Sequence, residues 1–146
     1  MNYIKTPSQY IKEDYMKSDA IGYKIGKYIY HVTTSNNVDN IYKNGFEPKD
    51  GISINGEKFE NRLYFATSLI SAYDLSVNFS SYKSDEEYVI FKINSNYIDD
   101  DYEEDPLFQH GIYIDYKIPS KYIVNIIKAD DLFDKFDDND IEDLYL

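Results

Sequence analysis

Residues 27–46 read KYIYHVTTSNNVDNIYKNGF, and this stretch decides the fold expected for the chain. Residues 27–31 are β-branched and aromatic, which is typical of a strand. The polar residues 33–35 (Thr-Thr-Ser) offer a helix N-cap, and residues 38–42 carry apolar side chains at helical spacing. Gly45 follows them as a helix stop. The stretch therefore predicts a strand, a capped helix and a glycine that ends it.

Further elements are predicted on both sides of this stretch. A short amphipathic helix is expected over residues 8–18. Downstream, the patterns predict a loop over 47–61 with room for a small hairpin, a strand over 62–66, a helix over 69–79 capped by Thr67 or Ser68, an exposed acidic loop over 99–105, and strands over 87–93, 111–116 and 122–128. The tail, residues 129–146, has eight acidic residues, one lysine and scattered apolar positions, which favours an acidic amphipathic helix. With no internal repeat, residues 1–146 are expected to form a single α+β domain with a mixed or antiparallel sheet.

Composition excludes several classes of function. The formal net charge is −12, so DNA or RNA is not an expected direct partner, because nucleic-acid binding relies on basic side chains. The chain has no cysteine and two histidines, so neither disulfides nor a zinc site can be argued. No apolar run approaches the roughly 20 residues that span a bilayer, and no signal peptide is visible, which makes the cytoplasm the expected location. The 17 tyrosines and the single arginine fit AT-rich codon usage.

Two segments together resemble the NAD pocket of ADP-ribosyltransferases of the diphtheria-toxin and poly(ADP-ribose) polymerase type. The first is Tyr30-His31-Val32-Thr33-Thr34 with the helix and glycine after it, and the second is Leu63-Tyr64-Phe65-Ala66-Thr67-Ser68 followed by Ser71-Ala72-Tyr73. The resemblance covers roughly residues 28–80 and continues more loosely over 111–123. It implies a split mixed or antiparallel sheet with flanking helices, and NAD as the bound substrate, with no metal.

The resemblance also implies roles for individual residues. The positions that correspond to NAD contacts are His31, Val32, Thr33, Tyr64, Ser71 and Tyr73. His31 is expected to donate a hydrogen bond to a ribose hydroxyl while a neighbour fixes its other ring nitrogen. The backbone of Val32 is expected to pair with the nicotinamide amide, and the ring of Tyr64 to stack on the nicotinamide. Ser71 corresponds to an amide contact and Tyr73 to a second stacking wall.

The third catalytic position of the family differs in this chain. Transferases of this type carry a Glu at the start of a late strand, where its charge stabilises the oxocarbenium-like transition state. The corresponding position falls at His110 or Gly111, with Gln109 just before it. A Gln or His can hydrogen-bond a ribose but does not bring the negative charge. The implied catalytic set is therefore His31 and Tyr64, with His110 or Gln109 in place of the Glu.

Three functions follow as alternatives. The first is a mono-ADP-ribosyltransferase that moves ADP-ribose from NAD to a protein acceptor, of a size that suits a phage or bacterial effector. The second is a transferase-like module that binds NAD, an ADP-ribose derivative or a protein without chemistry. The third is an acidic inhibitor that uses its tail and the acidic loop over 99–105 to imitate DNA and occupy a basic cleft. For Arg62, the only arginine, both a surface salt bridge and contact with the cofactor pyrophosphate are open.

Overall fold

The computed structural model describes residues 25–52, 56–82, 85–98, 101–105, 108 and 110–132 of the chain. Its elements follow in the order β1 (Tyr28–Thr34), η1 (Ser35–Asn37), α2 (Val38–Asn44), β2 (Lys49–Ile52), β3 (Lys58–Ala66), α3 (Leu69–Tyr82), β4 (Tyr88–Asn94), η2 (Ser95–Tyr97), β5 (Glu103–Glu104), β6 (Gly111–Ile114), η3 (Ser120–Tyr122) and β7 (Ile123–Lys128), where η marks a 3₁₀ turn. Residues 129–132, where the acidic tail helix is expected to begin, are helical. The expected helix over 8–18, the tail beyond residue 132 and Gln109 lie outside the described residues.

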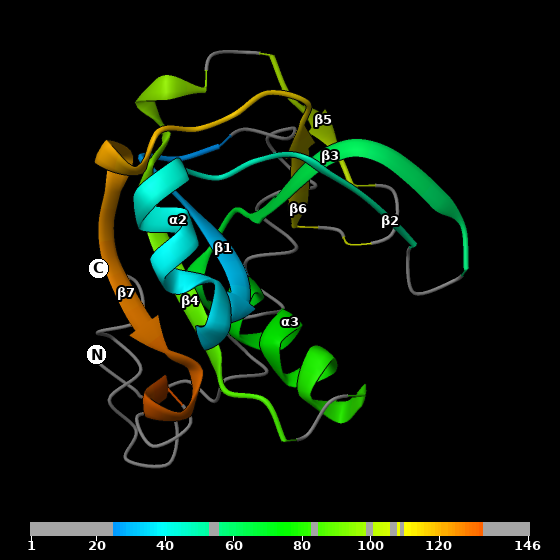
Figure 1. Cartoon of the computed structure of the whole chain (residues 1–146), viewed down its shortest axis with the longest axis vertical. Helices are drawn as coiled ribbons and strands as arrows, with labels where there is room; N and C mark the ends of the chain where they lie inside the picture. The colour runs from blue at the N-terminus through cyan, green and yellow to red at the C-terminus, as the bar shows by residue number, and fades with distance from the viewer. Residues whose placement is uncertain are drawn as a thin grey trace, which may run out of the picture.

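The strands form one antiparallel sheet in the order β5-β6-β3-β1-β4-β7, with β2 paired to the first half of β3. This confirms the expected single α+β domain, with an antiparallel rather than mixed sheet. Strand β1 pairs with β4 along its whole length, from Tyr28↔Asn94 to Thr34↔Tyr88. Its ladder with β3 has the one pair Tyr30↔Ala66. Toward the end of β1 that ladder stops, and β3 curves away from the body of the sheet (Figure 1).

Within the described residues, α2 covers one face of the central strands and α3 covers the other. On one face Ile41 of α2 joins a core that contains Ile29 and Phe91, both fully buried. On the other face Ile70 of α3 packs in a second core with Tyr30. Because neighbouring strand residues point to opposite faces, a strand covered on both sides is apolar or aromatic at successive positions. This accounts for the unbroken KYIY run that predicted β1.

Gly45 ends α2, as the sequence predicts. Its φ is +79°, a left-handed value that disfavours other residues, and its N–H donates to the carbonyl oxygen of Ile41 at 2.7 Å. A Cβ at this position would lie 2.5 Å from the carbonyl oxygen of Ile118. Phe46 then pairs with Ile118 through N···O contacts of 2.8 and 3.0 Å. The glycine thus serves both the helix end and the close approach of the turn before β7.

The two predicted helix caps have different outcomes. Thr34 precedes the 3₁₀ turn and Asn37 precedes α2, and neither side chain makes a capping hydrogen bond, so the cap expected at residues 33–35 is wrong. The reason is that the chain enters α2 through a turn. For α3, the hydroxyl of Ser68 accepts the N–H of Ser71 at 3.1 Å, which makes Ser68 the cap. Thr67 instead donates its hydroxyl to the carbonyl oxygen of His110 at 3.1 Å.

The segment 47–61 contains the small hairpin for which the sequence leaves room, formed by β2 and the first half of β3. The departure from expectation is its extent, because β3 begins at Lys58 rather than at residue 62. The hairpin forms an arm that extends from the body of the sheet (Figure 1). Asn61 has a φ of +53°, and its N–H donates to the carboxylate of Asp50 at 2.8 Å. This contact joins the two strands where the arm leaves the sheet.

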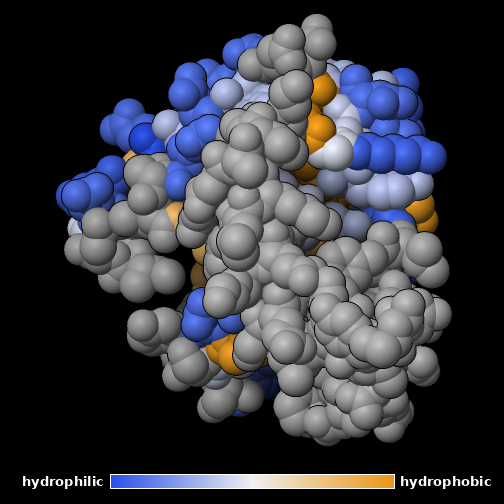
Figure 2. All heavy atoms as spheres, turned by 180° about the vertical axis from the view of Figure 1, so that it is seen from behind, coloured by the Kyte–Doolittle hydropathy of each residue, from blue (hydrophilic) through white to orange (hydrophobic). Residues whose placement is uncertain are grey.

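The surface carries scattered apolar side chains. Seen from behind, the coloured residues are mostly hydrophilic, with hydrophobic ones in small separate patches (Figure 2). Of the large apolar side chains that the structure describes, Ile52 of β2 is the most exposed, at 69%. Among the described helices, none combines the length and apolar character that a membrane crossing requires.

Candidate functional site

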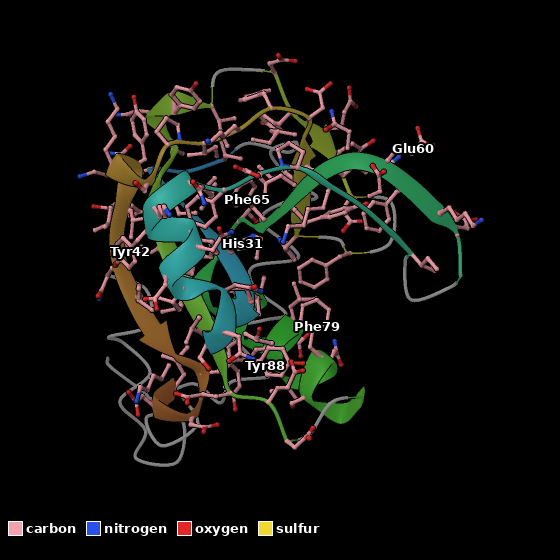
Figure 3. The ribbon with its side chains drawn as sticks, in the orientation of Figure 1. His31, Tyr42, Glu60, Phe65, Phe79 and Tyr88 are labelled. Carbon is pink, nitrogen blue, oxygen red and sulfur yellow. The ribbon has the colours of Figure 1, made fainter. Side chains whose placement is uncertain are left out.

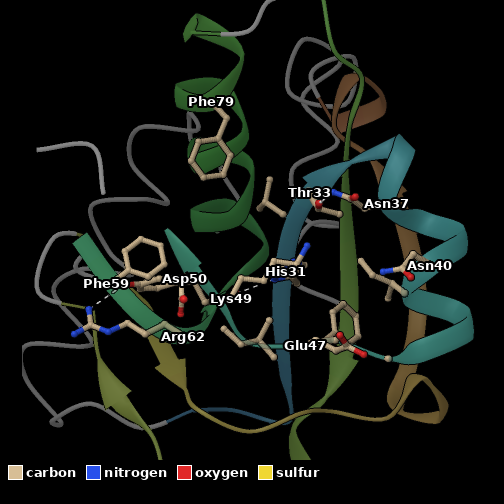
Figure 4. Close-up of a pocket in the computed structure, with 16 residues that line it drawn as sticks. His31, Thr33, Asn37, Asn40, Glu47, Lys49, Asp50, Phe59, Arg62 and Phe79 are labelled. Atoms are coloured by element: carbon tan, nitrogen blue, oxygen red, sulfur yellow. Dashed lines mark hydrogen bonds between the residues drawn. The ribbon is translucent and has the colours of Figure 1, made fainter. Parts of the chain in front are cut away.

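A cavity of about 350 Å³ opens where the β1–β3 ladder stops. Figure 4 shows its walls, which are the end of β1 with α2 on one side, the β2–β3 hairpin on the other, and α3 above. Its volume lies within the range of small-molecule sites, which is roughly 300–1,000 Å³. Four residues expected to contact NAD line it, namely His31, Val32, Thr33 and Tyr64.

His31 lies at the centre of the cavity (Figure 4). Its Nδ1 is 2.8 Å from the carbonyl oxygen of Tyr64, so this nitrogen carries the proton and donates it. The ring also packs edge-on against Phe46, with centroids 5.3 Å apart, and beside Phe65 at 5.6 Å (Figure 3). The hydrogen bond to Tyr64 fixes the tautomer of the imidazole, and the packing against Phe46 and Phe65 fixes the plane of its ring.

Burial lowers the pKa of His31 from 6.5 to about 4. The hydrogen bond to the Tyr64 carbonyl opposes this change, because it favours the charged ring. The positive charge of the nearby Lys49 ammonium lowers the pKa further. At neutral pH the imidazole is therefore uncharged, and its Nε2 is a hydrogen-bond acceptor. From the sequence, His31 is expected to donate a hydrogen bond to the ribose, whereas in the structure its free nitrogen accepts one. The sequence does not show that the N–H of the ring is already bound by the Tyr64 carbonyl.

Thr33 and Asn37 form a polar wall beside His31. The side-chain amide of Asn37 donates to the Thr33 hydroxyl oxygen at 2.8 Å and reaches the Thr34 hydroxyl oxygen at 3.4 Å. The Thr33 oxygen is thus held as an acceptor, and its own proton can be donated to a ligand. Asn37 lines the cavity as well and was not among the predicted site residues.

Arg62 is packed among aromatic rings. Its guanidinium donates to the Tyr64 hydroxyl at 3.0 Å and lies 4.2 Å from the centre of the Tyr113 ring and 6.0 Å from that of Phe59. The Tyr64 ring packs between Phe59 and Tyr113 at 5.2 and 5.5 Å. Within the described residues, Arg62 thus makes a cation–π cluster at the cavity rather than a surface salt bridge.

Two carboxylates line the cavity, and the sequence did not single out either of them. Asp50 lies on the hairpin, where its Oδ1 accepts the N–H of Asn61. Glu47 lies between α2 and β2 and is 3.5 Å from the Lys117 ammonium, both side chains being about half exposed. In the sequence, these two acids lie on either side of Lys49 in a segment expected to be a loop with room for a hairpin, and no motif distinguishes them.

Other predicted site residues lie elsewhere in the described structure. Ser71 is buried on α3, 1% exposed, and its hydroxyl oxygen accepts from the Ser68 hydroxyl at 2.8 Å. Tyr73 lines a separate open groove beside Tyr88. His110 is also 1% exposed, and its carbonyl oxygen is bound by Thr67, one strand beyond the cavity. None of these three is part of the cavity lining.

No protein-family model matches the chain, and comparison with curated proteins gives no significant match. In the part of the chain that the structure describes, no three His, Asp or Glu side chains converge as metal ligands would.

Proposed function

We propose that the cavity binds NAD and that the protein is an ADP-ribosyltransferase-like domain that transfers ADP-ribose to a macromolecular acceptor. The observation that carries the proposal is the neutral imidazole of His31, with Nδ1 held by the Tyr64 carbonyl and Nε2 left as an acceptor in the cavity. A ribose presents hydroxyl donors at short spacing, which suit Nε2. The Thr33 hydroxyl beside it can donate to a ligand oxygen.

The end of the β1–β3 ladder supports the position expected for the nicotinamide amide. Val32 lies beyond Tyr30, the residue of β1 that pairs with β3. The edge of β1 that faces β3 is therefore not covered by the ladder at this point. Backbone groups at such an edge can bind an amide as a neighbouring strand does. Lys49 and Arg62 supply positive charge toward the pyrophosphate.

The reaction itself needs a carboxylate near the ribose. When the bond from ribose C1′ to the nicotinamide nitrogen breaks, its electron pair leaves with nicotinamide, and positive charge develops on the sugar. An acceptor nucleophile then bonds to C1′ and releases its proton. The carboxylates of Asp50 and Glu47 are the acidic groups among the described cavity residues that can stabilise this charge.

Titration calorimetry with NAD, paired with an assay for released nicotinamide, tests the proposal. The wild-type chain should bind NAD saturably and release nicotinamide. His31→Asn keeps an N–H for the Tyr64 carbonyl but removes the acceptor Nε2, and should weaken NAD binding by about tenfold, the value of one hydrogen bond of about 1.4 kcal/mol. Tyr97→Leu, an exposed substitution away from the cavity, is the control. Absence of binding by the wild type at millimolar NAD would rule the proposal out.

A second candidate, an NAD-binding module without chemistry, is favoured by the position of His110. That residue is one of the positions that correspond to the expected Glu, and it is buried outside the cavity lining. In the same experiment, saturable NAD binding with no nicotinamide release selects the module over the enzyme.

A further inference from the structure

Two phenylalanines at one end of the cavity were not part of any expected site. Phe59 comes from the β2–β3 hairpin and Phe79 from the later part of α3, and both line the cavity. Figure 4 shows Phe59 on the hairpin beside Arg62 and Phe79 above it on α3, both on the hairpin side of His31. A ligand that extends from His31 toward the hairpin would reach them.

The ring of Phe59 is held in place by its neighbours. It lies over Gly51 on the paired strand, where an added Cβ would be 2.4 Å from the ring carbon Cζ. The Tyr64 ring packs against it at 79°, with centroids 5.2 Å apart. Gly51 is therefore the residue that gives the ring its space, and any larger side chain there must move the ring.

The ring of Phe79 is supported from β4. Its centroid is 6.1 Å from that of Tyr88, and the two side chains lie side by side near the end of the helix (Figure 3). Phe79 is partly exposed, as expected for a side chain at an open cavity. Each phenylalanine is thus positioned by contacts outside the cavity before a ligand binds, which reduces the entropy that binding costs.

We infer that Phe59 and Phe79 bind the adenine ring of the dinucleotide, while the nicotinamide ribose lies at His31. The inference rests on the proposed function and assigns the orientation of the ligand. Two partly exposed, preorganised aromatic rings at one end of a cavity are suited to a planar base. Tyr64, the wall expected from the family resemblance, packs instead against Phe59 and Tyr113.

Charge distinguishes adenine from the nicotinamide ring at this end. The Arg62 guanidinium lies 6.0 Å from the centre of the Phe59 ring. The nicotinamide ring of NAD is cationic, so it would be repelled here, whereas adenine is neutral. The adjoining phosphates are attracted by Arg62 and by Lys49 of β2. In Figure 4, Lys49 lies between Phe59 and His31, where a pyrophosphate between adenine and ribose would lie, and Arg62 lies on the outer side of Phe59.

The test compares AMP, nicotinamide mononucleotide and NAD as ligands in calorimetry. Phe59→Leu and Phe79→Leu keep apolar volume but lose the ring, and each should weaken AMP and NAD binding at least fivefold, because base stacking on one aromatic ring is worth about 5- to 150-fold. Their effect on nicotinamide mononucleotide should stay below about twofold. Gly51→Ala should reproduce the loss seen with Phe59→Leu, since it displaces the same ring. Tyr97→Leu is the control, and thermal melts confirm folding.

The outcomes separate this inference from the proposed function. Unchanged AMP and NAD affinity in both leucine variants overturns the adenine assignment while NAD binding by the wild type stands. If the leucine variants lose nicotinamide mononucleotide binding but keep AMP binding, the ligand lies in the reverse orientation, and the adenine assignment is also overturned. If the wild type binds AMP but not NAD, the aromatic site is supported and the proposed function fails.

Discussion

The protonation of His31 should make the stability of the protein depend on pH in a specific interval. The folded pKa is about 4, whereas the unfolded chain has the ordinary value of 6.5. Between these values the unfolded chain binds a proton that the folded chain excludes, so acidification favours unfolding. The stabilisation is complete above pH 6.5 and is lost as the pH falls toward 4.

The magnitude follows from the two pKa values. Linkage gives a loss of about 2 kcal/mol at pH 5 and about 3 kcal/mol at pH 4, relative to pH 7. Carboxylates also titrate in this interval, so the measurement is the difference between the wild type and His31→Asn, which shares every other titrating group. Both chains would be unfolded in urea at pH 7, 6 and 5 and followed by circular dichroism.

The expected result is a stability difference that shrinks on acidification. At pH 7 the wild type should be more stable, since the variant loses ring packing against Phe46 and Phe65. By pH 5 that advantage should fall by about 2 kcal/mol. A difference that is the same at pH 7 and pH 5 would refute the idea that His31 is held neutral in the folded protein.

A substitution at Gly45, with two other glycines as controls, tests the end of α2 beside the cavity, and a substitution at Arg62 tests ligand binding at its edge. Gly45→Ala should lower the free energy of unfolding in urea by about 2–4 kcal/mol, because of left-handed backbone strain and the contact with Ile118. Gly56→Ala, with a φ of +85° and open space around it, should lower it by only about 1 kcal/mol. Gly26→Ala has neither problem and should lie within about 0.5 kcal/mol of the wild type. Equal effects at Gly45 and Gly56 would show that the Ile118 contact adds no cost. Arg62→Met keeps an apolar stem over Tyr113 and should change stability by less than about 1 kcal/mol, while NAD affinity falls and loses much of its salt dependence. An unaltered salt dependence in that variant would remove Arg62 from ligand binding.

Local signals were enough to predict the centre of the fold. The strand, helix and glycine of residues 27–45 each have their own chemical pattern, and all three are present. The hairpin was underestimated because its residues are exposed on both sides, so the alternation of apolar and polar positions that identifies a strand is missing from Lys49–Ile52. Its β pairing depends on contact with the first half of β3, which a local pattern does not contain.

The site was predictable where one short segment supplies it. His31, Val32 and Thr33 are consecutive, and they line the cavity together. Phe59 and Phe79 come from different elements and line the same cavity only after the arm and α3 are in place. The sequence also does not show which face of a helix points into a cavity. For this reason it does not distinguish Ser71, which is buried, from a residue that lines the cavity.

The position of β1 in the sheet has a consequence for synthesis on the ribosome. A nascent chain emerges from its N-terminal end, and β1 is the first strand of the described chain, yet it lies in the middle of the finished sheet. Its full-length partner is β4, whose Asn94 pairs with Tyr28, while β3 supplies only one pair. Until β4 has emerged, the edge of β1 that pairs along its whole length with β4 is without its native partner. The ladder that holds β1, and with it His31, in the sheet is therefore completed only after β4 has been made.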